Sequence, residues 1–293
     1  MKLENSEVSK LNFFDREIYL KRDDLLVGLE GNKARKFYSL ATNFPANIKK
    51  IISYGGVQSN AMLSLSKLAK LKKVELIYYV KAIPSFLEQN PHGNYYHALK
   101  NGMKLHTLGY DDFYQKVESI QSSLKENELF IPQGGAYEDA KMGIEKLGLE
   151  ISSFISEANL KNPVIWLSSG TGTTAFFLSS MRLFDVYTTP SVGDALYLEK
   201  QMDRLGSGFS PNIIETEDKI LFGNPHPKLY QIYKECLDAG VEFDLLYDSK
   251  TLLALKEKLE YFVGRDIVFI HSGGVYGNES MLPRYDLDFG SRK

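Results

Sequence analysis

Residues 49–80, KKIISYGGVQSNAMLSLSKLAKLKKVELIYYV, contain a short apolar run, a longer amphipathic segment and a second short apolar run. The apolar runs are rich in isoleucine, valine and tyrosine, as β-strands are, and the segment between them has helical spacing. A strand, a helix and a strand in this order form a βαβ unit with parallel strands. This stretch therefore predicts an α/β fold.

The same alternation extends over most of the chain. Further apolar runs of strand length lie in ELFIPQGG (128–135), PVIWLSSG (163–170), DVYTTPSV (185–192) and DIVFIHSGG (266–274). We predict an α/β protein of two lobes, with largely parallel, twisted sheets and flanking helices. The expected small domain covers residues 46–145, and residues 1–45 together with 146–293 form the large domain.

The amino-acid composition limits the kinds of molecule that the protein is expected to bind. The chain has 293 residues and a formal net charge of −2, so no overall positive charge favours nucleic acid or an anionic membrane. No window approaches the length of a membrane span, and the first residues lack the apolar core of a signal peptide. The single cysteine, Cys236, excludes an intrachain disulfide. We expect a cytoplasmic protein with a small-molecule ligand.

Glycine and hydroxyl residues gather where the expected strands end. These ends are SYGGVQSN (53–60), IPQGGAY (131–137), LSSGTGTT (167–174) and IHSGGVYGN (270–278). Ligands of doubly wound sheets bind where strands end and helices begin. The recurrence of one composition at this position predicts a single shared cleft.

The richest of these ends indicates a phosphate site. Glycines at 170 and 172 let backbone N–H groups approach an anion, while Thr171, Thr173 and Thr174 add hydroxyl donors at a helix N-terminus. The alternative is an ordinary glycine-rich turn with threonine caps. No Gly-Lys-Ser/Thr ends the loop, and Ala175 stands where a dinucleotide fingerprint requires its third glycine. A phosphate monoester fits better than a nucleotide.

The stretch GNKARK (31–36) places three cations at an expected helix start, where anions are usually preferred. On such a helix Lys33 and Lys36 share a face and Arg35 points elsewhere. A lysine there can lie beside a phosphorylated ligand or bond covalently to its aldehyde.

Two further groups of polar residues leave alternatives open. Gln58, Ser59 and Asn60 either hold a substrate carboxylate or cap the helix that follows them. The five histidines are too scattered for a metal site, and we expect none. His271 is expected to be a structural hydrogen-bonding residue rather than a base.

A reactive lysine together with a separate phosphate loop is the combination that pyridoxal phosphate requires. Here the sequence resembles the pyridoxal-phosphate enzymes of fold type II, and among them the 1-aminocyclopropane-1-carboxylate deaminase / D-cysteine desulfhydrase family. The resemblance covers most of the chain and rests on six motifs in order. They are KRDDLLVGLEGNKARK (21–36), GGVQSNAM (55–62), IPQGGAY (131–137), SSGTGTT (168–174), FDLLYDSK (243–250) and FIHSGG (269–274).

The resemblance implies a role for each matching residue. Lys33 carries pyridoxal 5'-phosphate covalently and later moves protons on the substrate, while Ser59 and Tyr247 act as nucleophile or proton relay. Asn60 lies near the cofactor's 3-hydroxyl group, and Gly170, Thr171, Gly172, Thr173 and Thr174 bind its phosphate. Asp248 and Ser272 occupy two positions that differ between the deaminase and desulfhydrase patterns and form a mixed pair here; the resemblance leaves open which of the two faces the pyridine nitrogen. Gln58, Ser59 and Asn60 contact the substrate.

The resemblance implies a lyase or deaminase that converts a D-cysteine-like amino acid or 1-aminocyclopropane-1-carboxylate to a 2-oxo acid and ammonia, with sulfide from D-cysteine. A homodimer is expected. One alternative is a non-catalytic protein of the same fold that still binds the cofactor. A second is a nucleotide-dependent oxidoreductase on a Rossmann-like sheet, which the missing third glycine disfavours.

Overall fold

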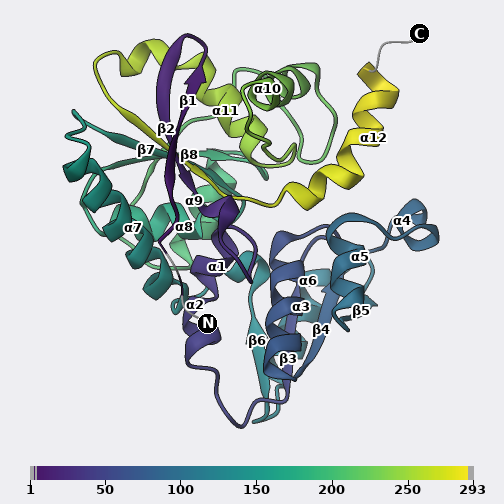
Figure 1. Cartoon of the computed structure of the whole chain (residues 1–293). Helices are drawn as coiled ribbons and strands as arrows, with labels where there is room; N and C mark the ends of the chain where they lie inside the picture. The colour runs from purple at the N-terminus through teal and green to yellow at the C-terminus, as the bar shows by residue number, and fades with distance from the viewer. Residues whose placement is uncertain (1–2, 4, 290–293) are drawn as a thin grey trace.

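The computed structural model describes residue 3 and residues 5–289. It contains two sheets. The larger has the strand order β1-β2-β10-β7-β8-β9, and the smaller has the order β5-β4-β3-β6. Figure 1 shows the larger sheet with its helices in the upper part of the molecule and the smaller sheet below it. The α/β fold with largely parallel sheets is confirmed.

The larger sheet combines the N-terminal strands with strands from the second half of the chain. Its strands are β1 (Val8–Phe13), β2 (Arg16–Arg22), β7 (Val164–Ser169), β8 (Asp185–Pro190), β9 (Asn212–Ile213) and β10 (Ile267–His271). Only β1 and β2 pair antiparallel among these described strands. Strands β7 and β10 are buried along their whole length, as expected of parallel strands covered on both faces.

Helices cover both faces of the larger sheet. They are α7 (Ala140–Glu157), α8 (Thr173–Ser180), α9 (Ala195–Asp203), α10 (Pro227–Asp238), α11 (Asp248–Glu257) and α12 (Asn278–Phe289). Helices α7 to α9 pack on one face, and α10 and α11 pack on the other around the fully buried Trp166. The sheet is thereby held between two apolar cores.

The smaller sheet is entirely parallel. Its strands are β3 (Lys50–Tyr54), β4 (Glu75–Val80), β5 (Lys104–Thr107) and β6 (Glu128–Ile131). The neighbouring helices are α1 (Asn32–Lys36), α2 (Tyr38–Thr42), α3 (Asn60–Lys72), α4 (Ser85–Gln89), α5 (Gly93–Lys100) and α6 (Phe113–Ser122). The β3-α3-β4 unit is the one that residues 49–80 predict.

The division into two domains remains a prediction, although one boundary needs adjustment. Residue 145 lies inside α7, and a continuous helix does not divide between two domains. Helix α7 packs against α1 at Gly143, where an added Cβ would lie 2.0 Å from the Arg35 carbonyl oxygen. A boundary at the start of α7 therefore keeps these packed helices together.

Candidate active site

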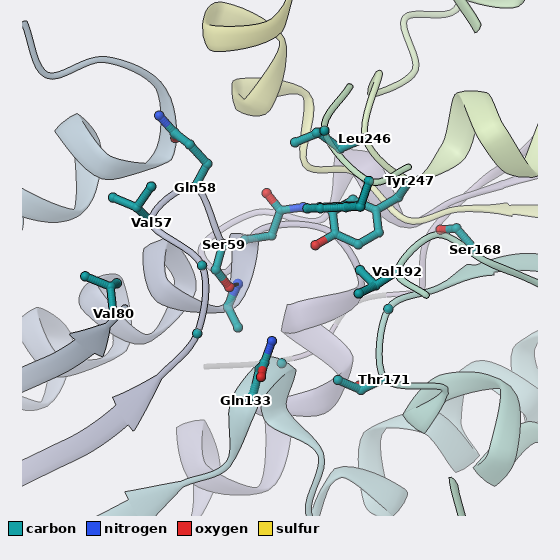
Figure 2. A pocket seen from close by; sticks show the side chains of 18 of the residues that line it. Val57, Gln58, Ser59, Val80, Gln133, Ser168, Thr171, Val192, Leu246 and Tyr247 are labelled. Atoms are coloured by element: carbon teal, nitrogen blue, oxygen red, sulfur yellow. Dashed lines mark hydrogen bonds between the residues drawn. The ribbon is translucent and has the colours of Figure 1, made fainter. Parts of the chain in front are cut away.

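One cavity of about 520 Å³ brings together the four glycine-rich strand ends. Gln58 and Ser59 come from the end of β3, Gln133 follows β6, Thr171 follows β7, and Ser272 follows β10. Figure 2 shows several of these side chains around the cavity. The predicted shared cleft is present, and it lies at the carboxyl ends of strands from both sheets.

Lys33 lines this cavity from the short helix α1. Its Nζ donates a hydrogen bond of 2.7 Å to Asn32 Oδ1. Burial lowers the pKa of Lys33 to about 8, although the negative charges of Asp244 and Asp248 oppose this shift. A substantial share of the amine is therefore neutral in mildly alkaline solution, which is the form that attacks an aldehyde.

Gly31 fixes the backbone that presents Lys33. Its φ of +50° lies in the region that glycine tolerates and other residues rarely adopt. A Cβ at this position would lie 1.9 Å from the Ser272 carbonyl oxygen. The close approach lets the Asn32 N–H donate to that same oxygen at 2.9 Å. The turn before α1 is thus held directly against the end of β10.

The other two cations of GNKARK have different surroundings. Arg35 is fully buried, and its guanidinium forms ion pairs with Asp23 at 2.7 Å and Glu150 at 2.6 Å. Lys36 lines the cavity and donates to the Gly134 carbonyl at 3.2 Å. Burial, together with the charge of Lys33, lowers the pKa of Lys36 well below its ordinary value. Lys33 and Lys36 share the cavity side, as the spacing predicts, and Arg35 points away into an ion cluster.

The residues after Gly55-Gly56 have structural partners as well as access to the cavity. Ser59 caps α3, with Oγ accepting from the N–H groups of Ala61 at 3.2 Å and Met62 at 3.4 Å. Asn60 Oδ1 accepts a 2.6 Å bond from Asn94. All three predicted residues line the cavity, and the capping alternative also holds for Ser59.

Gln58 has its side-chain amide engaged by α5. Its Nε2 donates to the His92 carbonyl, and its Oε1 accepts from the Tyr95 N–H. Substrate binding by this amide would require these bonds to exchange. Its predicted substrate contact remains a prediction, and the observed bonds use the amide to anchor α5.

The loop from Gly170 to Thr174 lines the cavity and ends in the first turn of α8. Thr171 and Thr173 share a 2.9 Å hydrogen bond between their hydroxyl groups. The buried Thr174 Oγ1 has no hydrogen-bond partner within residues 5–289. A buried hydroxyl without a partner, beside the free N–H groups of a helix start, suits an anionic group such as a phosphate.

Asp248 lies behind the cavity wall in a buried polar network. Its carboxylate accepts from Ser168 Oγ at 2.6 Å and from the Ser272 N–H at 3.1 Å. The two serine hydroxyls lie 3.4 Å apart, and both serines line the cavity. The fold therefore brings Asp248 and Ser272 together, with the serine side chains nearer the ligand space.

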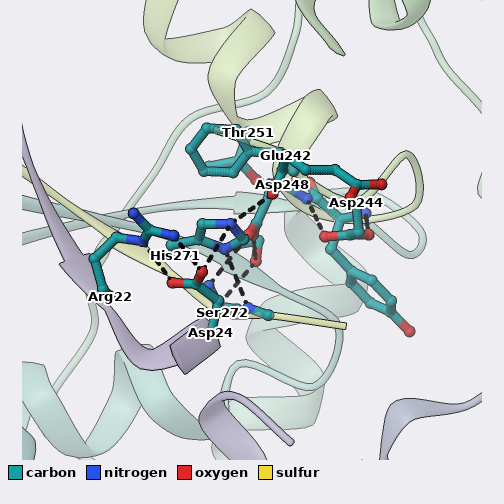
Figure 3. Close-up of polar contacts among 12 residues, drawn as sticks. Arg22, Asp24, Glu242, Asp244, Asp248, Thr251, His271 and Ser272 are labelled. Carbon is teal, nitrogen blue, oxygen red and sulfur yellow. Dashed lines mark hydrogen bonds and ion pairs between the residues drawn. The ribbon is translucent and has the colours of Figure 1, made fainter. Parts of the chain in front are cut away.

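His271 supports this network from the other side (Figure 3). Its Nδ1 lies 3.1 Å from the Asp248 carboxylate, and its Nε2 lies 2.8 Å from the Glu242 carbonyl and 3.7 Å from Asp24. Burial opposes protonation, but the hydrogen bond and charge of Asp248, with the charge of Asp24, raise the pKa of His271 above its ordinary value. A charged His271 forms an ion pair with the Asp248 carboxylate.

The backbone around Tyr247 is held in place by the Asp244 carboxylate. Asp244 accepts from the N–H groups of Leu246, Tyr247 and Asp248, which fixes the chain at the start of α11. Burial, followed by the charge of Asp248, raises the pKa of Asp244 to about 7. The hydroxyl of Tyr247 is directed into the cavity on the side of Ser59 (Figure 2), and burial raises its pKa.

Ser168 and Lys36 are cavity residues to which the sequence assigned no role. Ser168 contacts Asp248, which is 80 residues away, and sequence spacing carries no sign of that pairing. Lys36 matched the family motif but had no assigned partner; its position one turn after Lys33 was the available signal. Within the described part of the chain, no group of three or more His, Cys, Asp or Glu side chains could hold a metal ion.

Comparison with known proteins supports the class of fold. A crystal structure of an ACC deaminase homologue superposes with a TM-score of 0.77 at 22% identity, covering 96% of this chain and 94% of that chain. Serine racemase from Dictyostelium discoideum gives a TM-score of 0.65 at 13% identity, covering 93% of both chains. No family model matches. The chain has the fold of the pyridoxal-phosphate enzymes of fold type II.

Curated proteins of similar sequence point to one group of enzymes within this fold class. The bifunctional D-cysteine desulfhydrase/1-aminocyclopropane-1-carboxylate deaminase of Arabidopsis thaliana, described as mitochondrial, is 24% identical over 89% of this chain and 73% of its own length. A putative 1-aminocyclopropane-1-carboxylate deaminase of Pyrococcus furiosus is 26% identical over 89% of this chain and 85% of its own. The chain is an enzyme homologous to this group, as its motifs indicated.

Proposed function

We propose that the cavity binds pyridoxal 5'-phosphate, with Lys33 attached to the cofactor's aldehyde carbon. The donor set fits this group. The loop from Gly170 to Thr174 offers backbone N–H groups and the unpartnered Thr174 hydroxyl to the phosphate, and Lys36 adds an amine donor beside Gly134. Asn60, Ser168 and Ser272 line the same cavity; Asn60 would contact the ring's 3-hydroxyl group, and Ser168 and Ser272 would face its nitrogen.

The single observation that carries the proposal is the position of Lys33. Its amine is buried in the same cavity as the hydroxyl-rich loop, and its pKa is lowered to about 8. When bound, the cofactor withdraws electrons from the α-carbon of an amino acid substrate. Lys33, released by the incoming substrate amine, then has a pKa suited to removing a proton from that carbon.

The reaction that we propose is elimination from a D-cysteine-like amino acid. Lys33 takes the α-proton, the bond from the β-carbon to sulfur breaks, and the thiolate leaves as sulfide. Addition of water to the remaining unsaturated amine gives pyruvate and ammonia, so one D-cysteine and one water yield pyruvate, ammonia and hydrogen sulfide. Ser272 at the cavity wall, with a hydroxyl rather than an apolar side chain, is the feature that favours this route.

Deamination of 1-aminocyclopropane-1-carboxylate is the second candidate. This substrate has no α-proton, so ring opening requires a nucleophile or proton donor, and Ser59 and Tyr247 both reach the cavity. One substrate and one water would give 2-oxobutanoate and ammonia. The names of the curated relatives in Arabidopsis thaliana and Pyrococcus furiosus favour it. Those names give no support to the non-catalytic alternative.

An assay of the purified protein, incubated with pyridoxal phosphate, tests the proposal. We expect visible absorbance from bound cofactor, sulfide release from D-cysteine, and loss of both in Lys33→Ala. Release of 2-oxobutanoate from the cyclopropane acid without sulfide from D-cysteine would favour the second candidate. A protein that binds no cofactor and releases neither product would contradict both.

The assembly and location of the protein remain proposals. A homodimer rests on the family resemblance alone, and sedimentation analysis tests it. A cytoplasmic location rests on sequence composition. In the described residues no helix has the length and apolarity to cross a bilayer.

A further inference from the structure

Helix α12 forms one wall of the cavity. Ser280, Met281 and Arg284 all line it, and their spacing places them on one side of the helix. Helix α12 lies across from α5, a helix beside the smaller sheet (Figure 1). The cavity wall that α12 forms is therefore on the side of the larger sheet that faces the smaller sheet. None of these three residues belongs to the motifs that indicate cofactor binding.

The charges of the cavity wall all have one sign. Its ionisable lysine and arginine residues are Lys33, Lys36, Lys81 and Arg284, whereas no Asp or Glu of the described chain lines it. If the proposed function holds, the cofactor aldehyde uses Lys33, and its phosphate lies near Lys36. Lys81 and Arg284 are then left without a cofactor group to bind.

Arg284 keeps most of its donors free. Its Nη1 donates to the Gly223 carbonyl at 2.6 Å and lies 3.5 Å from Met281 Sδ. Arg284 forms no ion pair with any carboxylate in the part of the chain that the structure describes. A guanidinium has five N–H donors in a planar fork that matches a carboxylate, so this side chain can still bind an anion through two bonds.

The carbonyl that accepts from Arg284 belongs to a loop that also packs against Tyr247. Gly223 follows Phe222, whose ring lies 5.2 Å from the Tyr247 ring, centroid to centroid. Phe222, Gly223 and Tyr247 all line the cavity. The guanidinium is therefore held on the Tyr247 side of the cavity, one loop away from a predicted catalytic residue.

Lys81 lies on the small-sheet side of the same cavity. Its Nζ lies 5.6 Å from the ring centroid of Phe113 and 5.1 Å from that of Tyr114. These aromatic faces hold the ammonium group without neutralising it. Lys81 raises the positive potential of the cavity, but a point charge on a flexible chain selects an anion's geometry less strictly than Arg284 does.

We propose that Arg284 is a specificity-determining residue and that the β-substituent lost from the substrate carries an acidic group of its own, in addition to the substrate's α-carboxylate. Aspartate and glutamate, which have no such leaving group, then serve as non-reacting probes of this acid site. The inference rests on the proposed function, because it assigns Lys33 and Lys36 to the cofactor. We assign the α-carboxylate to the predicted substrate residues Ser59 and Asn60, which line the cavity at the start of helix α3. Arg284 then binds the side-chain acid, and Lys81 assists.

Binding of matched acid and amide ligands to the cofactor-loaded protein tests this. Calorimetric titrations compare aspartate with asparagine and glutamate with glutamine, in both enantiomers. We expect at least one acid to bind about tenfold more tightly than its amide, a difference that one desolvated charge contact readily supplies. Arg284→Gln should abolish the preference for the acid over its amide, and Arg284→Lys should retain part of it. Lys234→Gln is the control, because it removes an exposed cation outside the cavity and should leave the preference unchanged.

Two results would overturn the inference. One is a wild-type protein that binds every acid and its amide equally. The other is an Arg284→Gln variant that weakens acids and amides alike, because Arg284 would then bind the α-carboxylate common to both. Failure of the proposed function has a different signature, namely a wild-type protein that takes up no pyridoxal phosphate in the absorbance measurement.

Discussion

The Asn32 N–H donates to the Ser272 carbonyl oxygen at 2.9 Å, which ties the turn before Lys33 to the end of β10. One bond thus joins two motifs that lie near opposite ends of the sequence. Lys33 and the Ser272 hydroxyl reach the same cavity from these two segments. The position of the reactive amine relative to the serine network therefore depends on this contact.

Gly31→Ala should disrupt that contact. Its Cβ would meet the Ser272 carbonyl oxygen and would force alanine to a φ of +50°. We expect a loss of about 3 kcal/mol in the free energy of unfolding, from strain and overpacking together. Gly56→Ala is the matched control, because its added Cβ meets nothing within 4 Å. Equal denaturation midpoints for the two variants would show that the close approach is not required.

Substitutions at Ser59 should separate its capping role from its chemical role. Ser59→Ala loses the cap of α3 and should lower the free energy of unfolding by about 1 kcal/mol. Ser59→Asn can cap the helix but has no hydroxyl group, so we expect near-wild-type stability with strongly reduced turnover. Urea denaturation and product assays on both variants test this. Full activity in Ser59→Asn would exclude a catalytic hydroxyl.

The contribution of His271 to stability should depend on pH. The pKa of His271 is raised in the folded state. The charged form of His271 therefore stabilises the fold, and this contribution is fully present below the ordinary histidine pKa. The contribution is lost as the pH rises through the folded-state pKa. We expect His271→Gln to lower the free energy of unfolding of the cofactor-free protein more at about pH 6 than at about pH 9. A difference that is independent of pH would mean that His271 acts only as a neutral hydrogen-bonding group.

The buried Lys33 amine should make the cofactor-free protein more stable as the pH rises, which is the opposite of the effect expected for His271. Its pKa is about 8 when folded and 10.5 when unfolded, so the unfolded chain binds more protons between these values. The free energy of unfolding should therefore rise with pH across this window, by about 1.4 kcal/mol for each unit of pKa difference. Lys33→Met should lack this rise and be more stable than wild type at about pH 7. Parallel pH profiles for the two proteins would contradict a buried amine.

Sequence patterns predicted the parallel strands well because buried parallel strands are continuous apolar runs, as in β7 and β10. They did not indicate the antiparallel β1–β2 pair, since the pattern of β1 is weak and partly exposed. They also missed α12, where Pro283 and several charged residues interrupt a helical pattern. The part of the larger sheet that the sequence did not predict is therefore its β1–β2 edge.

The candidate site was predictable where residues are adjacent in sequence. The loop from Gly170 to Thr174 and the pair of lysines in GNKARK are local patterns with a physical meaning of their own. The contacts of Ser168 with Asp248 and of Gln58 with α5 depend on how distant segments pack, and a single sequence carries no measure of those distances. The sequence did not indicate that Arg284 lines the cavity, because that position also depends on how distant segments pack.

Reduction of the cofactor-loaded protein with borohydride, followed by peptide mapping, tests the central claim most directly. Borohydride converts a lysine–pyridoxal linkage to a stable amine, so the labelled peptide identifies the lysine. We predict the label on Lys33, and no label at the active site of Lys33→Ala. Label on the neighbouring Lys36 in the wild-type protein, or none on either residue, would contradict the account.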